Sequence, residues 1–395
     1  MRVYNNEMAK FLKKEEKMNV LVLGGCGEIG IFGTKDLVES SDVSRVIIGD
    51  LNIEKAEKAV ADIDSPKLST QKVDINDHQG LVEAMKGVDV VLNYTGPCYN
   101  LGLKAVKAAI EAGRHYVDIC DDYDSTLKML ALSDEAEEKG LTIIVGLGAS
   151  PGLANVLARY GSDTLDQTDE IHISWVIGAG EPEGPGVMYH TFHMITGTCP
   201  QFLDGKLVDV PALSGEETVV FPDPIGECRV SYWGHPEPVT LSKNIKGVKI
   251  VTNKGGSLPR EYDDLFKVLA MAGLTSPVPI SVKGQMVSPR DLLVAHFGTL
   301  PAVDIPPEGI HSGLVVEVKG KKQGMDTKIT LAGTGSVGAG TALAACVGAQ
   351  MIAQREVKAK GVMAPEECIE PEKMFPRLAE KGLVFTETTT TIKKP

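Results

Sequence analysis

The sequence predicts an α/β protein in which a doubly wound parallel sheet is joined to a second, α+β domain with a mixed or antiparallel sheet. Two observations carry this prediction. Between residues 18 and 157, short apolar runs alternate with amphipathic stretches, the pattern of repeated strand–helix–strand units. After Pro151 and Gly152, proline and glycine become frequent and apolar residues alternate with polar ones, as in half-buried strands.

The first segment contains six predicted strands, the number found in a doubly wound sheet. We expect these strands at residues 19–23, 45–49, 70–73, 88–93, 115–119 and 141–145. We expect the helices between them at residues 28–39, 53–61, 78–85, 102–111 and 126–139.

The second segment is predicted to contain strands at residues 171–177, 217–221, 239–241, 248–251 and 314–318. Further helices are expected in an alanine-rich stretch, residues 335–355, and in a capped segment, residues 370–381. The polar tail, residues 386–395, is expected to be loose. The predicted domains are therefore residues 18–150 and residues 151–335.

Charge and cysteine content exclude several classes of protein. A net charge of −13 opposes binding to nucleic acids and favours a cationic substrate such as a diamine. Seven scattered cysteines without a CxxC pair predict neither a disulfide framework nor a zinc site, and fit a reducing cytoplasm. We expect no bound metal, and no apolar run approaches the roughly 20 residues of a membrane span.

A glycine loop follows the first predicted strand and precedes the first predicted helix. It contains GxGxxG as Gly25, Gly27 and Gly30. Gly25 is expected to permit the tight turn, Gly27 to let the backbone approach a diphosphate, and Gly30 to let helix and strand pack closely. Together with Glu28 and Ile29 these residues predict the dinucleotide site of a Rossmann domain.

The cofactor is expected to be NAD, with NADP less favoured. Asp50 ends the second predicted strand, where a carboxylate can accept hydrogen bonds from the adenosine ribose and would repel a 2′-phosphate. No arginine follows it. The alternative is that Asp50 is a solvated acid at the end of a loop and binds no ligand. Asp74 and Ile75, after the third strand, are expected beside the adenine.

A second GxGxxG lies at residues 333–338, between a predicted strand and the alanine-rich helix. No strand that ends in an acid follows it, so we interpret these glycines as close packing at a helix start.

Candidate chemical groups follow strands four, five and six, because open α/β sheets bind ligands beyond the carboxyl ends of their strands. Strand four is followed by Thr95, Gly96, Pro97 and Tyr99, and strand six leads to Asn155. Strand five contributes Asp118, Asp121 and Asp122. Carboxylates can stabilise the cationic iminium formed when an amine is oxidised, and one can accept the ammonium proton. Helix capping is the alternative for these acids.

The combination of the glycine loop, Thr95-Gly96-Pro97, Tyr116-Val117-Asp118-Ile119 and the run from Ser150 to Asn155 resembles the saccharopine dehydrogenase family. That family includes lysine 6-dehydrogenases and carboxynorspermidine dehydrogenases. The resemblance extends over nearly the whole chain, and implies that C-terminal helices within residues 336–382 complete the Rossmann domain. It also implies a homodimer formed through the second domain, which binds the substrate.

By this resemblance, Thr95, Gly96 and Pro97 border the nicotinamide and Asp118 stands near the reacting carbon. Relatives commonly have a glycine and a glutamate after strand five, where this chain has Asp121 and Asp122. This departure leaves the substrate open.

The second domain contributes three candidate histidines. His190 and His193 lie in a polar–aromatic cluster, where opposite directions on a strand would exclude a shared metal. We assign His193 to catalysis and His190 to substrate binding. The alternative is that both are hydrogen-bonded histidines at the boundary between the two domains. His235 lies in a segment similar to one near the substrate site of relatives. Lys254 and Arg290 could hold a substrate carboxylate, and Arg290 has the better bidentate geometry for it, but the favoured expectation is that both are solvated charges.

The favoured function is an NAD-dependent oxidation of an amine C–N bond in a lysine-like amino acid or opine, or reduction of the imine. Catalysis is assigned to Asp118, Asp122 and His193, and substrate contacts to Tyr99, Asp121, Asn155, His190 and His235. Two alternatives stay open. They are a polyamine-linked lyase or transferase that uses tightly bound NAD, and a non-catalytic NAD-sensing module.

Overall fold

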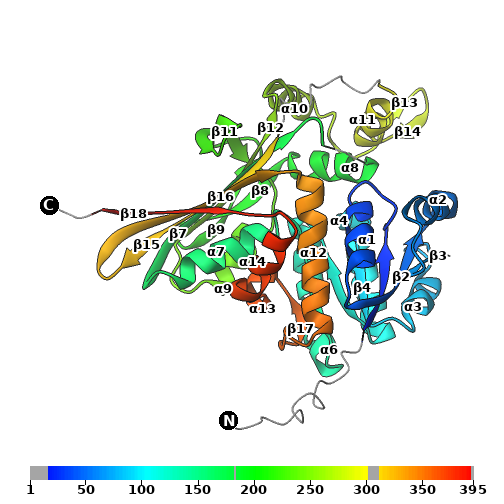
Figure 1. Ribbon diagram of the computed structural model, residues 1–395. Coiled ribbons are helices and arrows are strands. Elements are labelled where there is room, and N and C mark those ends of the chain that lie inside the picture. Colours follow the sequence, from blue (N-terminus) through cyan, green and yellow to red (C-terminus); the bar gives the residue numbers. More distant parts are fainter. Residues whose placement is uncertain (1–16, 182–183, 301–310, 393–395) are drawn as a thin grey trace, which may run out of the picture.

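The computed structural model describes residues 17–181, 184–300 and 311–392, which form two sheets joined by a shared core (Figure 1). The first sheet has seven parallel strands in the order β17-β6-β5-β4-β1-β2-β3. Its strands are β1 (Met18–Leu23), β2 (Val43–Asp50), β3 (Leu68–Lys72), β4 (Val90–Asn93), β5 (His115–Asp118), β6 (Thr142–Ile144) and β17 (Gly361–Met363).

Helices cover both faces of this sheet, so its strands are apolar on both sides. Within β1, Leu21 and Leu23 face one apolar cluster, whereas Val20 and Val22 face another that continues into the second sheet. The helices are α1 (Gly30–Glu39), α2 (Ile53–Ile63), α3 (His78–Met85), α4 (Cys98–Ala112), α5 (Tyr123–Leu130), α6 (Ser133–Glu138) and α12 (Val337–Ala353). The alanine-rich α12 lies beside α1 and stands between the two sheets (Figure 1).

The second sheet has nine strands and is mixed, because β12 pairs with β7 in parallel and the other pairs are antiparallel. Its strands are β7 (Gln167–Gly178), β8 (Thr198–Leu203), β9 (Lys206–Pro211), β10 (Glu217–Phe221), β11 (Gly226–Tyr232), β12 (Ile250–Leu258), β15 (Ser312–Lys322), β16 (Met325–Gly335) and β18 (Thr386–Ile392). A separate hairpin consists of β13 (Ile280–Val282) and β14 (Gln285–Val287).

The remaining helices pack around this second sheet and along its boundary with the first sheet, which we call the seam. They are α7 (Leu153–Asp163), α8 (Pro185–Met194), α9 (Glu237–Asn244), α10 (Glu261–Met271), α11 (Pro289–Phe297), α13 (Pro365–Cys368) and α14 (Pro371–Glu380). None of the helices within the described residues is long and apolar enough to cross a membrane.

Several predicted elements were wrong. Residues 239–241 lie in α9 and residues 189–193 in α8, where tertiary packing overrides the β propensity of valine, threonine and tyrosine. The predicted helix over residues 126–139 is two helices, α5 and α6. The tail is not loose between Thr386 and Ile392, because β18 pairs with β16 along its whole length.

We propose the domain division that the sequence predicts, residues 18–150 with 336–382 and residues 151–335. The parallel sheet draws all its strands from residues 18–144 and 361–363, and the second sheet draws eight of its nine from residues 167–335. β18 lies outside both ranges and extends the second domain.

Candidate active site

The glycine loop joins β1 to α1, and three of its glycines, Gly24, Gly27 and Gly30, are each needed for a different reason. Gly24 has φ +70, and its nitrogen donates to the Gly49 carbonyl at 2.8 Å. The tight turn is therefore made by Gly24 and not, as predicted, by Gly25. A Cβ on Gly30 would lie 2.1 Å from the Gly24 carbonyl oxygen, which explains the close-packing role predicted for Gly30.

The N-terminal end of α1 is open to an anion. Its first turn contains no acidic residue, and Ile29 at the N-cap gives no side-chain hydrogen bond. A Cβ on Gly27 would meet only the Gly24 carbonyl oxygen, at 3.2 Å, so the outer side of Gly27 is free. Glu28 points to Lys55, 3.4 Å away, outside the turn. Free amides at a helix start fit a diphosphate.

Asp50 lies at the end of β2 next to this loop. Its carboxylate accepts hydrogen bonds from the Cys26 thiol at 3.0 Å and the Asn52 amide at 2.9 Å. Burial, and then the nearby carboxylate, raise the pKa of Cys26 to about 12, so the thiol stays protonated as the donor. Asp74 and Ile75 follow β3 at the same edge of the sheet, and Asp74 accepts from Asn76.

The second GxGxxG, residues 333–338, leads into the N-terminus of α12, and a protein carboxylate occupies this helix end. Glu181 accepts hydrogen bonds from Val337 N at 2.8 Å and from the Ser336 hydroxyl at 2.9 Å. An internal acid thus takes the place that a phosphate would need.

A buried hydrogen-bond chain connects β4 with β5 beneath the predicted nicotinamide position. The Thr95 hydroxyl and amide both donate to the Asn93 side-chain oxygen, at 2.6 and 2.9 Å. Asn93 in turn donates to the Tyr116 hydroxyl at 2.8 Å, and Tyr116 donates to Asp118 at 3.0 Å. The seam is close here, since a Cβ on Gly186 of α8 would lie 3.3 Å from the Gly96 carbonyl carbon.

Asp118 ends this chain. Its other oxygen accepts from the backbone amides of Cys120 at 3.0 Å and Gly146 at 2.8 Å. Burial raises the pKa of Asp118 to about 6, against the lowering effect of these hydrogen bonds. Both oxygens hold protein groups, so the geometry favours a positioning role for Asp118, and its predicted catalytic role stays a prediction.

His190 lies between two carboxylates. Its Nδ1 is 2.7 Å from Asp122 and its Nε2 is 2.9 Å from Asp121. Burial lowers the pKa of His190, but the two carboxylates outweigh burial and raise it to about 10, so the ring is an imidazolium that donates from both nitrogens. Asp122 is fully buried and also accepts from the Tyr99 amide at 2.8 Å. The Asp121 side chain remains 31% exposed.

A second histidine lies one helical turn further along α8, so the predicted strand geometry is corrected. The His193 ring stacks on Tyr99 at 4.4 Å between centroids, and its Nε2 donates to Asp124 at 3.1 Å. This hydrogen bond from His193 lowers the pKa of Asp124 to about 2. Arg290 of α11 lies 3.5 Å from His193 Nδ1. On a helix, positions 190 and 193 share a face, and both histidines contact acids from the Rossmann domain.

One group of possible metal ligands exists among the described residues. Cys98 Sγ and carboxylate oxygens of Asp121 and Asp122 lie within 4.8 Å of one another. The His190 imidazolium already pairs with both carboxylates, so the arrangement uses a protein cation in the place where a metal would bind.

His235 lies beside His190, with 5.9 Å between ring centroids. It follows β11 and precedes α9, whose first residue, Glu237, accepts a hydrogen bond from the Ser150 hydroxyl. Ser150 also accepts from Asn253 of β12 at 3.3 Å. The segment that the sequence singled out for His235 therefore joins the same seam.

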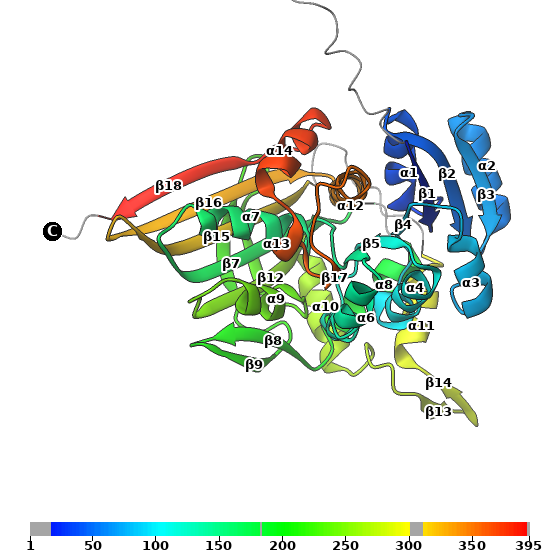
Figure 2. The same ribbon diagram turned by 90° about the horizontal axis from the view of Figure 1, so that it is seen from below.

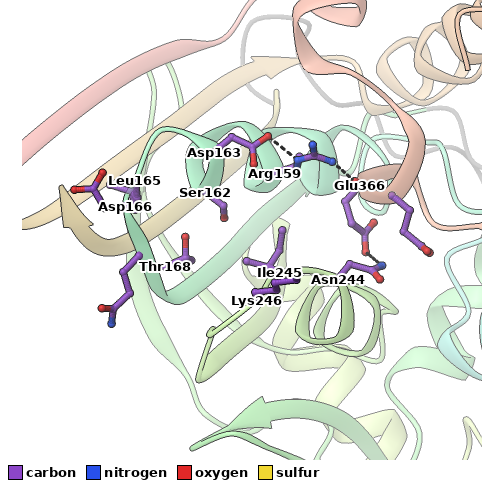
Figure 3. Close-up of a pocket in the computed structure, with 12 residues that line it drawn as sticks. Arg159, Ser162, Asp163, Leu165, Asp166, Thr168, Asn244, Ile245, Lys246 and Glu366 are labelled. Atoms are coloured by element: carbon purple, nitrogen blue, oxygen red, sulfur yellow. Dashed lines mark hydrogen bonds and ion pairs between the residues drawn. The ribbon is translucent and has the colours of Figure 1, made fainter. Parts of the chain in front are cut away.

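Asn155 is away from these acids. Its amide nitrogen donates to Thr240 at 3.3 Å and to Glu366 at 2.8 Å, and its oxygen accepts from Gly152. Both amide hydrogens are used, so the predicted substrate contact is replaced by a structural role. Glu366 instead lines a pocket of about 520 Å³ between α7, α9 and α13, where Asn244 points toward it (Figure 3).

Comparison with known proteins agrees with this architecture. Residues 20–144 match the family model described as saccharopine dehydrogenase NADP binding domain. Carboxyaminopropylagmatine dehydrogenase of Synechocystis sp. is 24% identical over 94% of this chain and 98% of its own. The chain is therefore similar to the saccharopine dehydrogenase family. It is accordingly an oxidoreductase with an NAD(P)-binding Rossmann domain.

Two further comparisons agree with this similarity. Carboxynorspermidine synthase of Vibrio cholerae is 25% identical over 78% of this chain and 79% of its own. The solved structure of saccharopine dehydrogenase (L-Glu forming) from Saccharomyces cerevisiae covers 94% of this chain and 100% of its own, with a TM-score of 0.66 and 15% identity. At this identity the structural likeness shows the fold alone.

Sequence reasoning assigned the wrong environment to two residues near this site and did not single out two others. Arg290 and Lys254 were expected to be solvated, yet both are buried, and Lys254 pairs with Glu217 at 3.0 Å. Asn93 and Glu237 were not singled out. Asn93 ends a strand directly before Thr95, which is a usable signal, whereas only the fold brings Glu237 to Ser150.

Proposed function

We propose that this protein is an NAD(P)-dependent dehydrogenase that oxidises a C–N bond of an amino acid carrying a second cationic nitrogen, or reduces the corresponding imine. The observation that carries this proposal is the Asp121–His190–Asp122 arrangement at the carboxyl edge of the parallel sheet, next to the Thr95-Gly96-Pro97 turn. The names of the relatives, carboxyaminopropylagmatine dehydrogenase and carboxynorspermidine synthase, point to carboxylated polyamines.

Charge balance supports a cationic substrate. Four carboxylates, those of Asp121, Asp122, Asp124 and Glu237, lie along the seam. The cations that contact them or lie beside them are the His190 imidazolium, the Lys128 ammonium and the Arg290 guanidinium, one fewer than the carboxylates. An excess of negative charge between low-dielectric walls attracts ammonium groups.

The cofactor residues of this proposal are Gly27, Gly30, Asp50 and Thr95. When bound, the nicotinamide accepts or gives the hydride. The α1 amides would hold the diphosphate, and Asp50 would accept from the ribose hydroxyls. We propose NAD over NADP, because the Asp50 carboxylate would repel a 2′-phosphate.

The proton of the substrate ammonium needs an acceptor, and the partly exposed Asp121 is the proposed one. In this proposal Asp121 accepts the proton of the substrate ammonium, while His190 holds the Asp121 carboxylate in place and Asp122 orients His190. The iminium formed by hydride loss is stabilised by the same negative charge. Tyr99 and His193, stacked on each other, form the adjacent wall.

The function is tested by following NADH absorbance with a panel of lysine, saccharopine, carboxynorspermidine and carboxyaminopropylagmatine, each with NAD and with NADP. We expect turnover with at least one carboxylated polyamine, and a preference for NAD of about tenfold or more, because the 2′-phosphate would face Asp50. Absence of turnover across the panel with both cofactors would contradict the proposal. Equal rates with NADP would contradict only the NAD preference.

We also propose a homodimer formed through the second domain. Most of the large apolar side chains that are strongly exposed lie on one segment, formed by α10, the β13–β14 hairpin and α11. They include Val268 at 62% and Met271 at 89% exposure. Among the described residues the hairpin pairs with no other strand, and it projects from the body (Figure 2). An isolated hairpin gains stability from a partner, and a second copy offers the same apolar face.

Analytical ultracentrifugation tests the dimer. We expect the wild type to sediment as a dimer at about micromolar concentration, and Val268→Lys with Met271→Lys to sediment as a monomer, since burial of two lysines at an interface is costly. Val220→Lys, at a 67% exposed site of β10, is the matched control and should stay dimeric. A monomeric wild type would refute the proposal.

We place the protein in the cytoplasm because its seven cysteines are free thiols.

A further inference from the structure

The hydrogen-bond chain between Thr95 and Asp118 has a fixed direction, because backbone amides anchor both of its ends. At one end the Thr95 amide, which can only donate, lies 2.9 Å from the side-chain oxygen of Asn93. At the other end the amides of Cys120 and Gly146 donate to one oxygen of Asp118. Backbone N–H groups cannot become acceptors, so they decide where the hydrogens of the side chains between them lie.

Each side chain between these ends therefore has one role. Asn93 turns its oxygen to Thr95, so its amide nitrogen faces Tyr116 and donates to that hydroxyl at 2.8 Å. The Tyr116 hydroxyl then donates to the second oxygen of Asp118 at 3.0 Å. Burial raises the pKa of Asp118 to about 6, so at pH 8 its carboxylate can only accept. Asn93, Tyr116 and Asp118 are at most 1% exposed, so solvent does not offer them other partners.

The consequence appears at the Thr95 hydroxyl, the end of this arrangement that a ligand can reach. This hydroxyl lies 2.6 Å from the Asn93 oxygen and has to donate its one hydrogen there. It has no second partner among the described residues, so its free capacity consists of lone pairs. Thr95 is partly exposed. A ligand group that bonds to this hydroxyl must therefore be a donor.

The place of Thr95 in the parallel sheet indicates which part of a ligand lies there. Thr95 follows β4, and the strand order β4-β1-β2 places it on the opposite side of the glycine loop from Asp50. The loop is adjacent, since a Cβ on Gly24 would lie 3.0 Å from the Thr95 methyl carbon. A dinucleotide spans the point where the strand order reverses, so with the adenosine at Asp50 its nicotinamide half lies on the β4 side.

The carboxamide is the group of the nicotinamide that carries N–H bonds. We propose that the Thr95 hydroxyl accepts a hydrogen bond from this carboxamide amino group. Asp118 is then a positioning residue, which fixes the acceptor role of Thr95 through the two side chains between them. This inference rests on the cofactor site of the proposed function, and gives Asp118 a role that needs no contact with the substrate.

Calorimetric titration at pH 8 with two cofactors tests the contact. The probes are NAD and 3-acetylpyridine adenine dinucleotide, in which a methyl ketone replaces the carboxamide and removes its N–H bonds. Thr95→Val keeps the shape of the side chain and removes the hydroxyl. We expect this variant to bind NAD about five- to tenfold more weakly, as for one hydrogen bond, and the analogue within about twofold of the wild type. Thr95→Ser keeps the hydroxyl and should keep the affinity for NAD.

Asp118→Asn tests the positioning role. The amides of Cys120 and Gly146 would hold the amide oxygen introduced at position 118, so its amino group would face Tyr116. The Tyr116 hydroxyl would then meet two donors and have no acceptor for its own hydrogen. The hydrogen-bond chain has to break or reverse as far as Thr95, so the ratio of NAD affinity to analogue affinity should fall as in Thr95→Val.

Tyr116→Phe separates this effect from damage to the buried core. It removes a buried hydroxyl, but the Thr95 amide still holds the Asn93 oxygen, so the affinity ratio should stay at the wild-type value. Tyr116→Phe combined with Asp118→Asn removes the conflict between donors and should restore the ratio. If Asp118→Asn does not fold, Asn93→Ala replaces it. The Thr95 hydroxyl is then free to donate to the ketone of the analogue, and the ratio should fall too.

The outcomes distinguish this inference from the proposed function. Equal losses of affinity for NAD and the analogue in Thr95→Val would overturn the contact, because the hydroxyl would then bind a part that both cofactors share. A folded Asp118→Asn variant with the wild-type ratio would overturn the positioning role. A protein that shows the expected ratios but turns over nothing in the substrate panel supports the inference and refutes the dehydrogenase activity. A wild type that binds neither cofactor refutes both.

Discussion

Replacement of Asp122 by asparagine is expected to lower turnover by a factor of about 100, because the proposed base Asp121 would no longer be held in position by His190. Asp122 does not reach solvent and acts through His190, whose Nδ1 it accepts at 2.7 Å. An amide in its place provides one acceptor for two donors, His190 and the Tyr99 amide. The His190 imidazolium would then lose its fixed orientation toward Asp121. Steady-state kinetics with the best substrate of the panel measure this loss.

Stability against pH provides an independent readout of the same arrangement. The pKa of His190 is raised to about 10, above the roughly 6.5 of an unfolded histidine. The stabilisation is therefore fully present below pH 6.5 and is lost as the pH rises from about 6.5 through 10, on the order of a few kcal/mol. Urea unfolding between pH 6 and 10 should show this decline, and Asp122→Asn should make it smaller, because one of the two carboxylates is gone.

The control for this experiment is Asp124→Asn, which removes a carboxylate that pairs with His193 and not with His190. This variant should keep the decline of stability between pH 6.5 and 10. An identical pH dependence in wild type and Asp122→Asn would show that His190 is not held as an imidazolium.

The second large effect is expected at the glycine loop. There, substitution of Gly30 should destabilise the fold, whereas substitution of Gly27 should weaken cofactor binding. Gly30→Ala places a methyl group 2.1 Å from the Gly24 carbonyl oxygen, so backbone must move, and we expect a loss of about 3 kcal/mol or more in unfolding free energy. Gly27→Ala meets only one atom, at 3.2 Å, and should fold nearly as the wild type. Its methyl group would occupy the diphosphate position and weaken NAD binding about tenfold or more.

Calorimetric NAD titration and thermal unfolding measure both variants. Gly335→Ala serves as a background for the loss of glycine itself, because this exposed glycine, like Gly27 and Gly30, has no left-handed φ and its Cβ would meet no atom within 4 Å. A Gly27→Ala variant with wild-type affinity for NAD would remove this loop from the cofactor site.

Much of the Rossmann domain was readable because its signals are local. The glycine loop, the six strands and the acid at the end of β2 all follow from residues within a few positions of one another. The seventh strand was missed, because β17 has only three residues and becomes a strand only by pairing with β6. The second domain was harder, since valine and threonine at residues 239–240 belong to a helix there.

The candidate site shows the same division. Asp121 and Asp122 were found because strand ends in an open α/β sheet meet at one edge. The sequence singled out His190, but not its contact with Asp122. A strand was predicted there, in which His190 and His193 would point in opposite directions. In α8 the two histidines share a face, and they contact Asp122 and Asp124.

The sequence by itself determined the family resemblance, the cofactor loop and the acidic character of the predicted reacting edge, because each depends on residue type and spacing along the chain. Only the tertiary structure decided that Asp118 is enclosed by backbone amides, that Asn155 is used up by Thr240 and Glu366, and that Glu237 lies against His235. The physical reason is that pKa, burial and unpaired hydrogen-bonding capacity depend on neighbours brought together from distant parts of the chain, and no local pattern records them.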